Sequence, residues 1–338
     1  MRFALLLFGV TSSTCLFAQE TSLSGPVEAI TFDAPTRSLR AVIGFPGAAS
    51  FGPALIDSLD FASVAPHQSY GIVFETGKCL FVSGLNAKTI SSKEITGITK
   101  YPDGIVWSAD GSLAVLYSLA GNWFQTIAGF PNSPVAGAVI DVSSLSGSLT
   151  TIAVDPSGNR IAIAIDGASG AVYETSADAV GGQFTPLVSL AKAVSLSFSS
   201  DGQTLYALDA ATVQVTAVSI NGNGFQTFVL PGIANPIAIQ SALDSGNRQL
   251  LYVAGGSDRI LRILDVASQQ VVVNLSLGFQ PTSLNPFGTG SFVLASRARS
   301  ANPLWLFSNT PVPGAYFVPA IQTHLPDHET AEIVGRTR

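Results

Sequence analysis

The sequence predicts an all-β fold, a single β-propeller of six to seven four-stranded blades that repeats about every 44 residues. One phrase recurs along the chain: a short apolar run, a polar turn that usually contains glycine, and a second apolar run. The turn glycines Gly111, Gly158, Gly202, Gly246 and Gly290 lie 47, 44, 44 and 44 residues apart. Two further apolar segments follow each phrase, which gives four strands per repeat. The runs are short and interrupted by glycine, proline, asparagine and aspartate, so helical repeats are excluded.

Residues 1–18 have the pattern of a secretory signal. Arg2 supplies a positive start, Phe3 to Val10 form a short apolar run, and Ala18 is a small residue before a polar change. This apolar run is shorter than the ~20 residues that a membrane span requires, so we expect no membrane span in the mature protein. The sequence therefore predicts export to the periplasm or the extracellular space, with residues 19–26 as a linker.

The two cysteines of the chain have different expected fates. Cys15 lies inside the predicted signal, so Cys79 would be alone in the mature chain and no internal disulfide is expected. Cys79 precedes the apolar residues Leu80 to Val82, which predicts a buried, inert thiol on a strand. Lipidation of Cys15 is an alternative, although Ser12 to Thr14 lack the leucine and small residue expected before a lipidated cysteine.

The propeller itself is expected over residues 27–320, followed by a polar tail at residues 321–338. Six complete repeats fit between Phe61 and Val318, and an additional strand pair lies between Val27 and Ile43. We expect this pair to be the third and fourth strands of a blade that closes the ring beside the late strand Leu304 to Ser308.

One repeat resembles the YVTN-type β-propeller family. The matching residues are Tyr252-Val253, Ile263-Leu264-Asp265, Val271, Leu275, Gly278 and Pro281, and Ile30 to Asp33 with Leu39 look like a second, less complete copy. The resemblance implies an exported bacterial propeller of the lactonase-like superfamily. Some propellers of this kind act as lactonases and many have no assigned activity, so the resemblance implies architecture more than chemistry.

The first strand of each blade lines the central channel, and in this chain those strands carry no ionisable residue. They are expected at Phe61 to Ala65, Gly104 to Ser108, Thr151 to Val154, Val194 to Phe198, Ile237 to Gln240 and Thr282 to Asn285. General acid–base catalysis has no group to use there. We therefore expect no catalytic residue in the channel and no cofactor.

Metal and nucleic-acid binding are not expected either. His67 lies in a predicted hairpin turn, and His324 and His328 lie in the polar tail, which does not make a set of converging metal ligands. A net charge of -6 leaves no basic surplus for phosphates.

The candidate binding residues lie on loops that join the second and third strands, all on one rim of the ring. They are Glu75, Lys78, Asp166, Asp209, Asp258, Arg259, Arg297 and Arg299. Arg297 and Arg299 form the most concentrated positive pair and are expected to hold an acidic group. Two long connections, residues 44–58 and 129–148, are expected to cover one end of the channel. Their aromatic residues Phe45 and Phe130, with nearby Trp123, are predicted either to pack onto the blades or to contact a protein or glycan.

These observations favour an exported, non-enzymatic scaffold that binds a protein or glycan partner in the cell envelope through its loop rims, and a monomer is expected. One alternative is a lactonase-like hydrolase with a loop-built site, which converging arginine, histidine and carboxylate groups at one channel mouth would favour. A second alternative is a subunit of an envelope complex, which a contiguous exposed apolar patch would favour.

Overall fold

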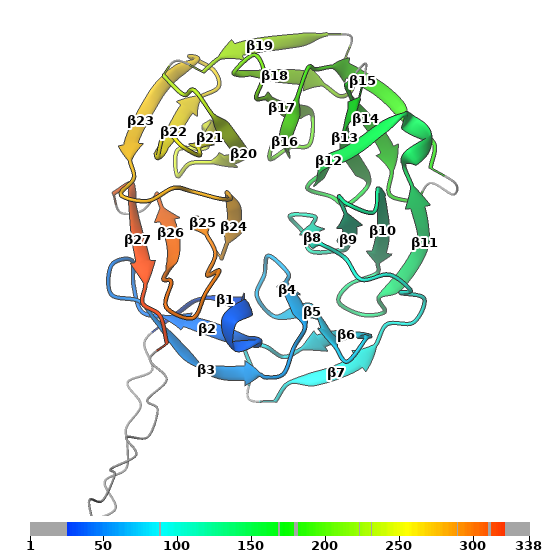
Figure 1. Ribbon diagram of the computed structural model, residues 1–338, viewed down its shortest axis with the longest axis vertical. Coiled ribbons are helices and arrows are strands. Elements are labelled where there is room, and N and C mark those ends of the chain that lie inside the picture. Colours follow the sequence, from blue (N-terminus) through cyan, green and yellow to red (C-terminus); the bar gives the residue numbers. More distant parts are fainter. Residues whose placement is uncertain are drawn as a thin grey trace, which may run out of the picture.

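The structure is a computed structural model that describes residues 26–87, 89–167, 170–178, 182–222, 224–230, 232–288, 290–309 and 312–321. Seven antiparallel sheets surround a central axis like the blades of a propeller (Figure 1). The predicted all-β propeller is confirmed, and the blade number is seven. The signal and most of the linker and tail lie outside the described residues.

The first three blades use residues 27–141. Blade 1 contains β1 (Val27–Asp33), β2 (Ser38–Ile43) and β3 (Ser50–Ile56), with the 3-10 turn η1 (Ala34–Thr36) between β1 and β2. Blade 2 contains β4 (Phe61–Val64), β5 (Tyr70–Glu75), β6 (Lys78–Ser83) and β7 (Ser91–Glu94). Blade 3 contains β8 (Gly104–Trp107), β9 (Leu113–Ser118), β10 (Trp123–Ala128) and β11 (Val135–Asp141).

The remaining four blades follow the same order. The 3-10 turn η2 (Ser143–Leu145) leads into blade 4, with β12 (Gly147–Val154), β13 (Arg160–Gly167), β14 (Ala171–Ser176) and β15 (Thr185–Ser189). Blade 5 contains β16 (Ala193–Phe198), β17 (Thr204–Asp209), β18 (Gln214–Ser219) and β19 (Phe225–Val229). Blade 6 contains β20 (Pro236–Leu243), β21 (Gln249–Gly255), β22 (Ile260–Asp265) and β23 (Gln270–Ser276). Blade 7 contains β24 (Asn285–Phe287), β25 (Ser291–Ala295), β26 (Leu304–Ser308) and β27 (Gly314–Val318).

In blades 2 to 7 the first strand is innermost and the fourth is outermost (Figure 1). This order gives the ring two distinct faces. We call the face with the second-to-third turns and the connections between blades the turn face. The opposite face carries the first-to-second and third-to-fourth turns, and we call it the hairpin face.

The repeated glycines have the predicted conformational role in most blades. Gly111, Gly158 and Gly202 have φ angles of 74°, 73° and 70° in the first-to-second turn, a region that glycine enters without steric cost. In blade 6 the residue with positive φ is Asn247 rather than the neighbouring Gly246. In blade 2 the same place is taken by Gln68, with φ 60°.

Blade 1 differs from the prediction. Ile30 to Asp33 and Leu39 to Ile43 are not its third and fourth strands, because they lie in β1 and β2 and a further strand, β3, is outermost. Asp33 at the end of β1 bonds Arg297 in the second-to-third turn of blade 7, which places the end of β1 on the turn face. The strand β1 therefore occupies a second-strand position, and the described residues place no strand on its inner edge. The Ile30 N–H on that edge donates to Gln68 Oε1 at 2.5 Å.

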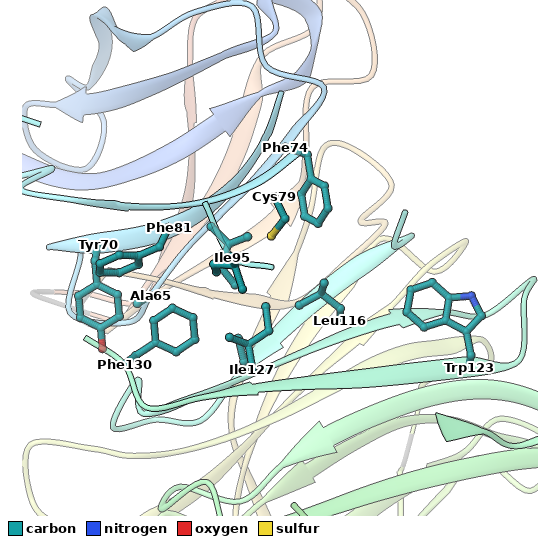
Figure 2. Close-up of a cluster of buried hydrophobic side chains, with 12 residues drawn as sticks. Ala65, Tyr70, Phe74, Cys79, Phe81, Ile95, Leu116, Trp123, Ile127 and Phe130 are labelled. Carbon is teal, nitrogen blue, oxygen red and sulfur yellow. The ribbon is translucent and has the colours of Figure 1, made fainter. Parts of the chain in front are cut away.

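The two long connections do not cover the channel, which corrects the expectation for them. Residues 44–58 contain β3 and residues 129–148 contain β11, and both strands lie on the outer circumference (Figure 1). Phe130 and Trp123 are buried between blades 2 and 3, where Phe130 faces Tyr70 and Phe81 (Figure 2). Phe45 is 66% exposed.

The ring closes where blade 1 meets blade 7, as expected from the sequence. Ala29 and Val42 pack with Leu304 and Leu306 in one buried cluster. The strands of blade 1 pair only with one another among the described residues, so side-chain packing and not a shared sheet joins the two ends. The other hydrophobic clusters likewise lie between neighbouring blades, since each sheet has two faces to bury. Within the described part of the chain, no helix has the length and apolar character that a membrane span requires.

Candidate binding surfaces

The six innermost strands β4, β8, β12, β16, β20 and β24 contain no Asp, Glu, His, Lys or Arg. Several of their polar groups bond the neighbouring inner strand instead of facing the channel. Trp107 Nε1 donates to Ser63 Oγ at 2.9 Å, and the Ser241 N–H donates to Ser197 Oγ at 3.0 Å. The hydroxyls of these strands therefore connect blades, and these six strands contribute no acid or base to the wall of the channel.

The predicted rim residues do lie on one face, the turn face, but two of its aspartates have structural partners. Asp209 is 2% exposed and accepts the N–H groups of Ala191, Lys192 and Ala211. Asp258 accepts the N–H groups of Ala234 and Asn235 at 2.7 and 2.9 Å. Each carboxylate holds the connection that enters its own blade. These contacts are similar to those of a helix cap. In both, a carboxylate oxygen accepts hydrogen bonds from backbone N–H groups that have no backbone partner.

The sequence predicts that Arg297 and Arg299 hold an acidic group of a ligand or partner, whereas the structure pairs Arg297 with Asp33 of the same chain. Arg297 Nη1 donates to both Asp33 carboxylate oxygens at 2.9 Å, and its Nε donates to the Asn302 carbonyl oxygen at 2.9 Å. The residue is 5% exposed, so the guanidinium is committed to the junction between blades 7 and 1. Arg299, the second arginine of the predicted positive pair, is exposed on the same loop.

The remaining predicted residues are spread around the turn face. Lys78 pairs with Glu94 at 3.1 Å across blade 2, and Glu75 opposes Lys78 in the β5–β6 hairpin. Asp166 is exposed near the end of β13. Arg259 adopts a φ of 53° in the turn of blade 6, and its carbonyl oxygen accepts the Leu277 N–H. The structure therefore does not gather these groups into one site.

A patch that the sequence analysis missed lies on the turn face over blades 1 to 3. We call Arg37, Asp60, Lys100 and Tyr101 the Tyr101 patch. Arg37 forms an ion pair with Asp60, and Asp60 also accepts the Thr76 N–H at 3.0 Å. Tyr101 is 50% exposed, and its ring lies 5.0 Å from that of Phe74. Burial and the Asp60 charge raise the pKa of Tyr101, while the Arg37 charge opposes this, so all three groups share one local field.

Lys100 extends this patch toward blade 3. Its ammonium group lies 5.5 Å from the centre of the Trp123 ring, a cation–π geometry. The patch could not be predicted from the sequence, because its members come from three separate connections: the β1–β2 turn, the approach to β4 and the β7–β8 connection. Only the folded ring brings them together.

A cavity of about 250 Å³ lies on the turn face where blades 7, 1 and 2 meet. Its lining includes Arg297 and Asp33 on the side of blade 7, and Phe32 and Phe61, whose rings lie 6.0 Å apart, between blades 1 and 2. Asp33 at the end of β1 and Ala34 in the β1–β2 turn also line the cavity, so it lies beside the turn-face end of blade 1.

The described residues do not assemble the converging set that a loop-built hydrolase requires. His67 lies in the first-to-second turn of blade 2, on the hairpin face, whereas Arg37 and Asp60 lie on the turn face. His324 and His328 lie outside the described residues. Across the described ranges, no three His, Cys, Asp or Glu side chains gather in a way that could hold a metal ion.

The described chain is thus a seven-bladed β-propeller in which the inner strands of blades 2 to 7 carry no ionisable residue and charged groups lie on the turn face. No protein-family model and no curated protein matches the chain. Among solved structures, a predicted 6-phosphogluconolactonase from Bacteroides fragilis superposes with a TM-score of 0.59 at 12% identity, covering 87% of this chain and 95% of that one.

Two further solved structures are similar. A chain of the yeast heterotrimeric Nup82–Nup159–Nup116 nucleoporin complex has a TM-score of 0.58 at 10% identity, covering 78% of this chain and 90% of that one. A chain of a nidogen/laminin complex has a TM-score of 0.48 at 13% identity, covering 72% of this chain and 91% of that one. At such identities the Bacteroides fragilis and nucleoporin structures show the propeller fold alone.

Proposed function

We propose that the protein is an exported, non-enzymatic β-propeller that binds a protein partner in the cell envelope through the Tyr101 patch. Export rests on the signal pattern of residues 1–18 and on the resemblance to YVTN-type repeats, whose members are exported bacterial propellers. The absence of ionisable residues from the inner strands favours binding over channel chemistry.

The observation that carries the proposal is the exposure of Tyr101 beside a positioned ion pair. Tyrosine and arginine are the residues that most often dominate the binding energy of protein interfaces. Tyr101 has a half-exposed ring fixed against Phe74, and Arg37 has a side chain that is 60% exposed while it is oriented by Asp60. Side chains that are already oriented lose less conformational entropy when a partner covers them.

The test compares partner capture by three immobilised forms of residues 19–338 exposed to an envelope extract of the source organism. The wild-type protein and Phe225→Ala, whose exposed aromatic lies on the hairpin face, should retain one protein in near-stoichiometric amount. Tyr101→Ala should retain about 30-fold less, the loss expected for removal of a binding hot spot of about 2 kcal/mol.

Heat-unfolded protein gives the background, and quantitative mass spectrometry gives the readout. Equal retention by the wild-type protein and Tyr101→Ala would contradict the proposal, as would retention of nothing above background. Loss of capture in Phe225→Ala alone would move the binding surface to the other face.

A further inference from the structure

An open crevice of about 460 Å³ lies on the hairpin face between blades 5 and 6. Blade 5 supplies one wall from β17, β18 and β19, and Val266 in the third-to-fourth turn of blade 6 closes the other side. The volume lies within the range of about 300–1,000 Å³ that small-molecule sites occupy. The crevice is on the opposite side of the ring from the Tyr101 patch.

The crevice contains a tyrosine hydroxyl that makes no hydrogen bond to a described residue and is open to the crevice. Four tyrosines of the described chain are less than a tenth exposed, and three of them have hydroxyl partners: Tyr70 donates to the Gly111 carbonyl oxygen, Tyr252 accepts from Asn309, and Tyr316 donates to Glu28. The fourth, Tyr206, is 3% exposed and lines the crevice, and its hydroxyl has no hydrogen bond to any described residue. A buried tyrosine normally finds a partner for this group.

The other groups in the crevice are polar but uncharged. Thr204, Ser219 and Gln226 supply hydroxyl and amide groups, and Phe225 supplies a ring that is 62% exposed. Among the described residues, no charged side chain lines the crevice. Burial and the nearby Asp201 carboxylate raise the pKa of Tyr206 to about 12. The tyrosine therefore stays neutral, and an anionic ligand would meet the negative charge of Asp201.

Gly222 leaves room for the Ser219 hydroxyl at the edge of the crevice. A Cβ atom added at Gly222 would lie 2.7 Å from Ser219 Oγ and would crowd this hydroxyl. Both residues line the crevice.

From this combination we propose that the crevice binds an uncharged saccharide. A pyranose ring presents an apolar C–H face that packs on an aromatic ring and a rim of hydroxyls that exchange hydrogen bonds with neutral hydroxyl and amide groups. Phe225 offers the first kind of contact, and Tyr206, Thr204, Ser219 and Gln226 offer the second. The proposal is independent of the partner surface on the turn face.

Ligand-observed saturation-transfer NMR on residues 19–338 tests the proposal with maltose, cellobiose and N,N′-diacetylchitobiose as probes. At least one of these neutral disaccharides should bind, and glucuronate should bind more weakly than that disaccharide. Tyr206→Phe, which keeps the ring and removes only the hydroxyl, should weaken binding about threefold to tenfold, the loss of one hydrogen bond. Phe225→Ala and Gln226→Ala, whose side chains are exposed, should also weaken binding.

Two controls separate this test from the test of partner binding. Tyr173→Phe makes the same chemical change in blade 4, outside the crevice, and Tyr101→Ala changes the other face. Both should bind the disaccharide like the wild-type protein. Failure of all three disaccharides to bind, or equal binding by wild type and by Tyr206→Phe and Phe225→Ala, would overturn the proposal whatever the fate of the Tyr101 patch.

Discussion

Arg297 and Asp33 form an ion pair from opposite ends of the chain, and their side chains are only 2% and 0% exposed. The sequence predicts Arg297 on a rim that faces a ligand or partner, and it gives no sign of the intramolecular pair with Asp33. The sequence shows which residues carry a charge. Whether such a residue is buried, and which residue it pairs with, depends on which blades become neighbours in the folded ring. Asp33 and Arg297 meet only because the ring closes.

The pair leads to a prediction about stability. Arg297→Met should lower the free energy of unfolding by about 3–5 kcal/mol, because it leaves the Asp33 carboxylate buried without its partner. The double variant Arg297→Met, Asp33→Leu should recover much of this loss, since neither charge is then buried. Urea unfolding followed by circular dichroism measures both effects.

Arg299→Met is the matched control, since it removes an exposed arginine from the same loop. Its free energy of unfolding should change by no more than about 0.5 kcal/mol. If Arg297→Met were as stable as Arg299→Met, the ion pair would have no role in closing the ring.

Cys79 shows a residue whose state could be predicted from local sequence. It is buried within β6, and burial raises the pKa of its thiol to about 12, so the thiol is protonated and shielded at neutral pH. The apolar residues that follow it were sufficient to predict this outcome, because an apolar strand in a propeller is covered by neighbouring blades.

At the scale of elements, the recurring hairpin was predictable because its turn chemistry is local. In blade 5 Asp201 accepts hydrogen bonds from the Ser199 hydroxyl and the Gln203 N–H, while Gly202 takes the left-handed conformation. These bonds form within five residues, so the sequence alone contains the reason for the turn.

The same turn gives a prediction for pH dependence. The Ser199 hydroxyl and the Gln203 N–H hold the pKa of Asp201 below its usual value in the folded protein. The stabilisation is therefore complete above the unfolded pKa of about 3.9 and is lost as the pH falls through the lower folded value. The stability advantage of wild type over Asp201→Asn should be larger at pH 6 than at pH 2.5, as measured by urea midpoints.

Asp57→Asn serves as the control for this measurement, because it removes an exposed carboxylate outside the hairpin turns. A wild-type advantage over Asp201→Asn that does not decrease on acidification would show that the turn bonds do not favour the ionised carboxylate.

Strands β3 and β11 and the order of strands in blade 1 were not predicted correctly, and each error has a physical reason. The segment that forms β3 contains Gly52 and Pro53, which read as a loop, yet an outermost strand tolerates proline because its outer edge needs no donor. Strand β11 also lacks an alternation of apolar and polar residues, because five of its seven residues are alanine, glycine or valine. Blade 1 was misassigned because the hairpin phrase, the strongest signal in the repeat, requires a first strand that the described blade does not have.

For the whole molecule, the repeat period of the sequence was sufficient to predict the propeller architecture but not the binding surfaces. The spacing of the turn glycines fixed the repeat, and closure beside Leu304 to Ser308 followed from the need to protect the ends of the ring. The Tyr101 patch and the saccharide crevice combine residues from neighbouring blades or distant connections. Such combinations appear only when the angle and spacing between blades are known.

The outer strands of the ring carry several exposed apolar residues. They are Val135 on blade 3, Phe225 and Val229 on blade 5, Val272 on blade 6 and Phe317 on blade 7. Blades 5, 6 and 7 follow one another around the ring (Figure 1). Exposed apolar residues in single positions are normal for a folded protein, so these residues do not by themselves decide whether the protein is a subunit of an envelope complex.

Amide hydrogen exchange with and without the captured partner shows whether the partner covers the turn face over blades 1 to 3. We expect slower exchange in the β1–β2 turn around Arg37, in the approach to β4 around Asp60, and in the β7–β8 connection around Tyr101. Exchange on the hairpin face should be unchanged. Protection confined to the hairpin face, or no protection at these three segments, would refute binding through the Tyr101 patch.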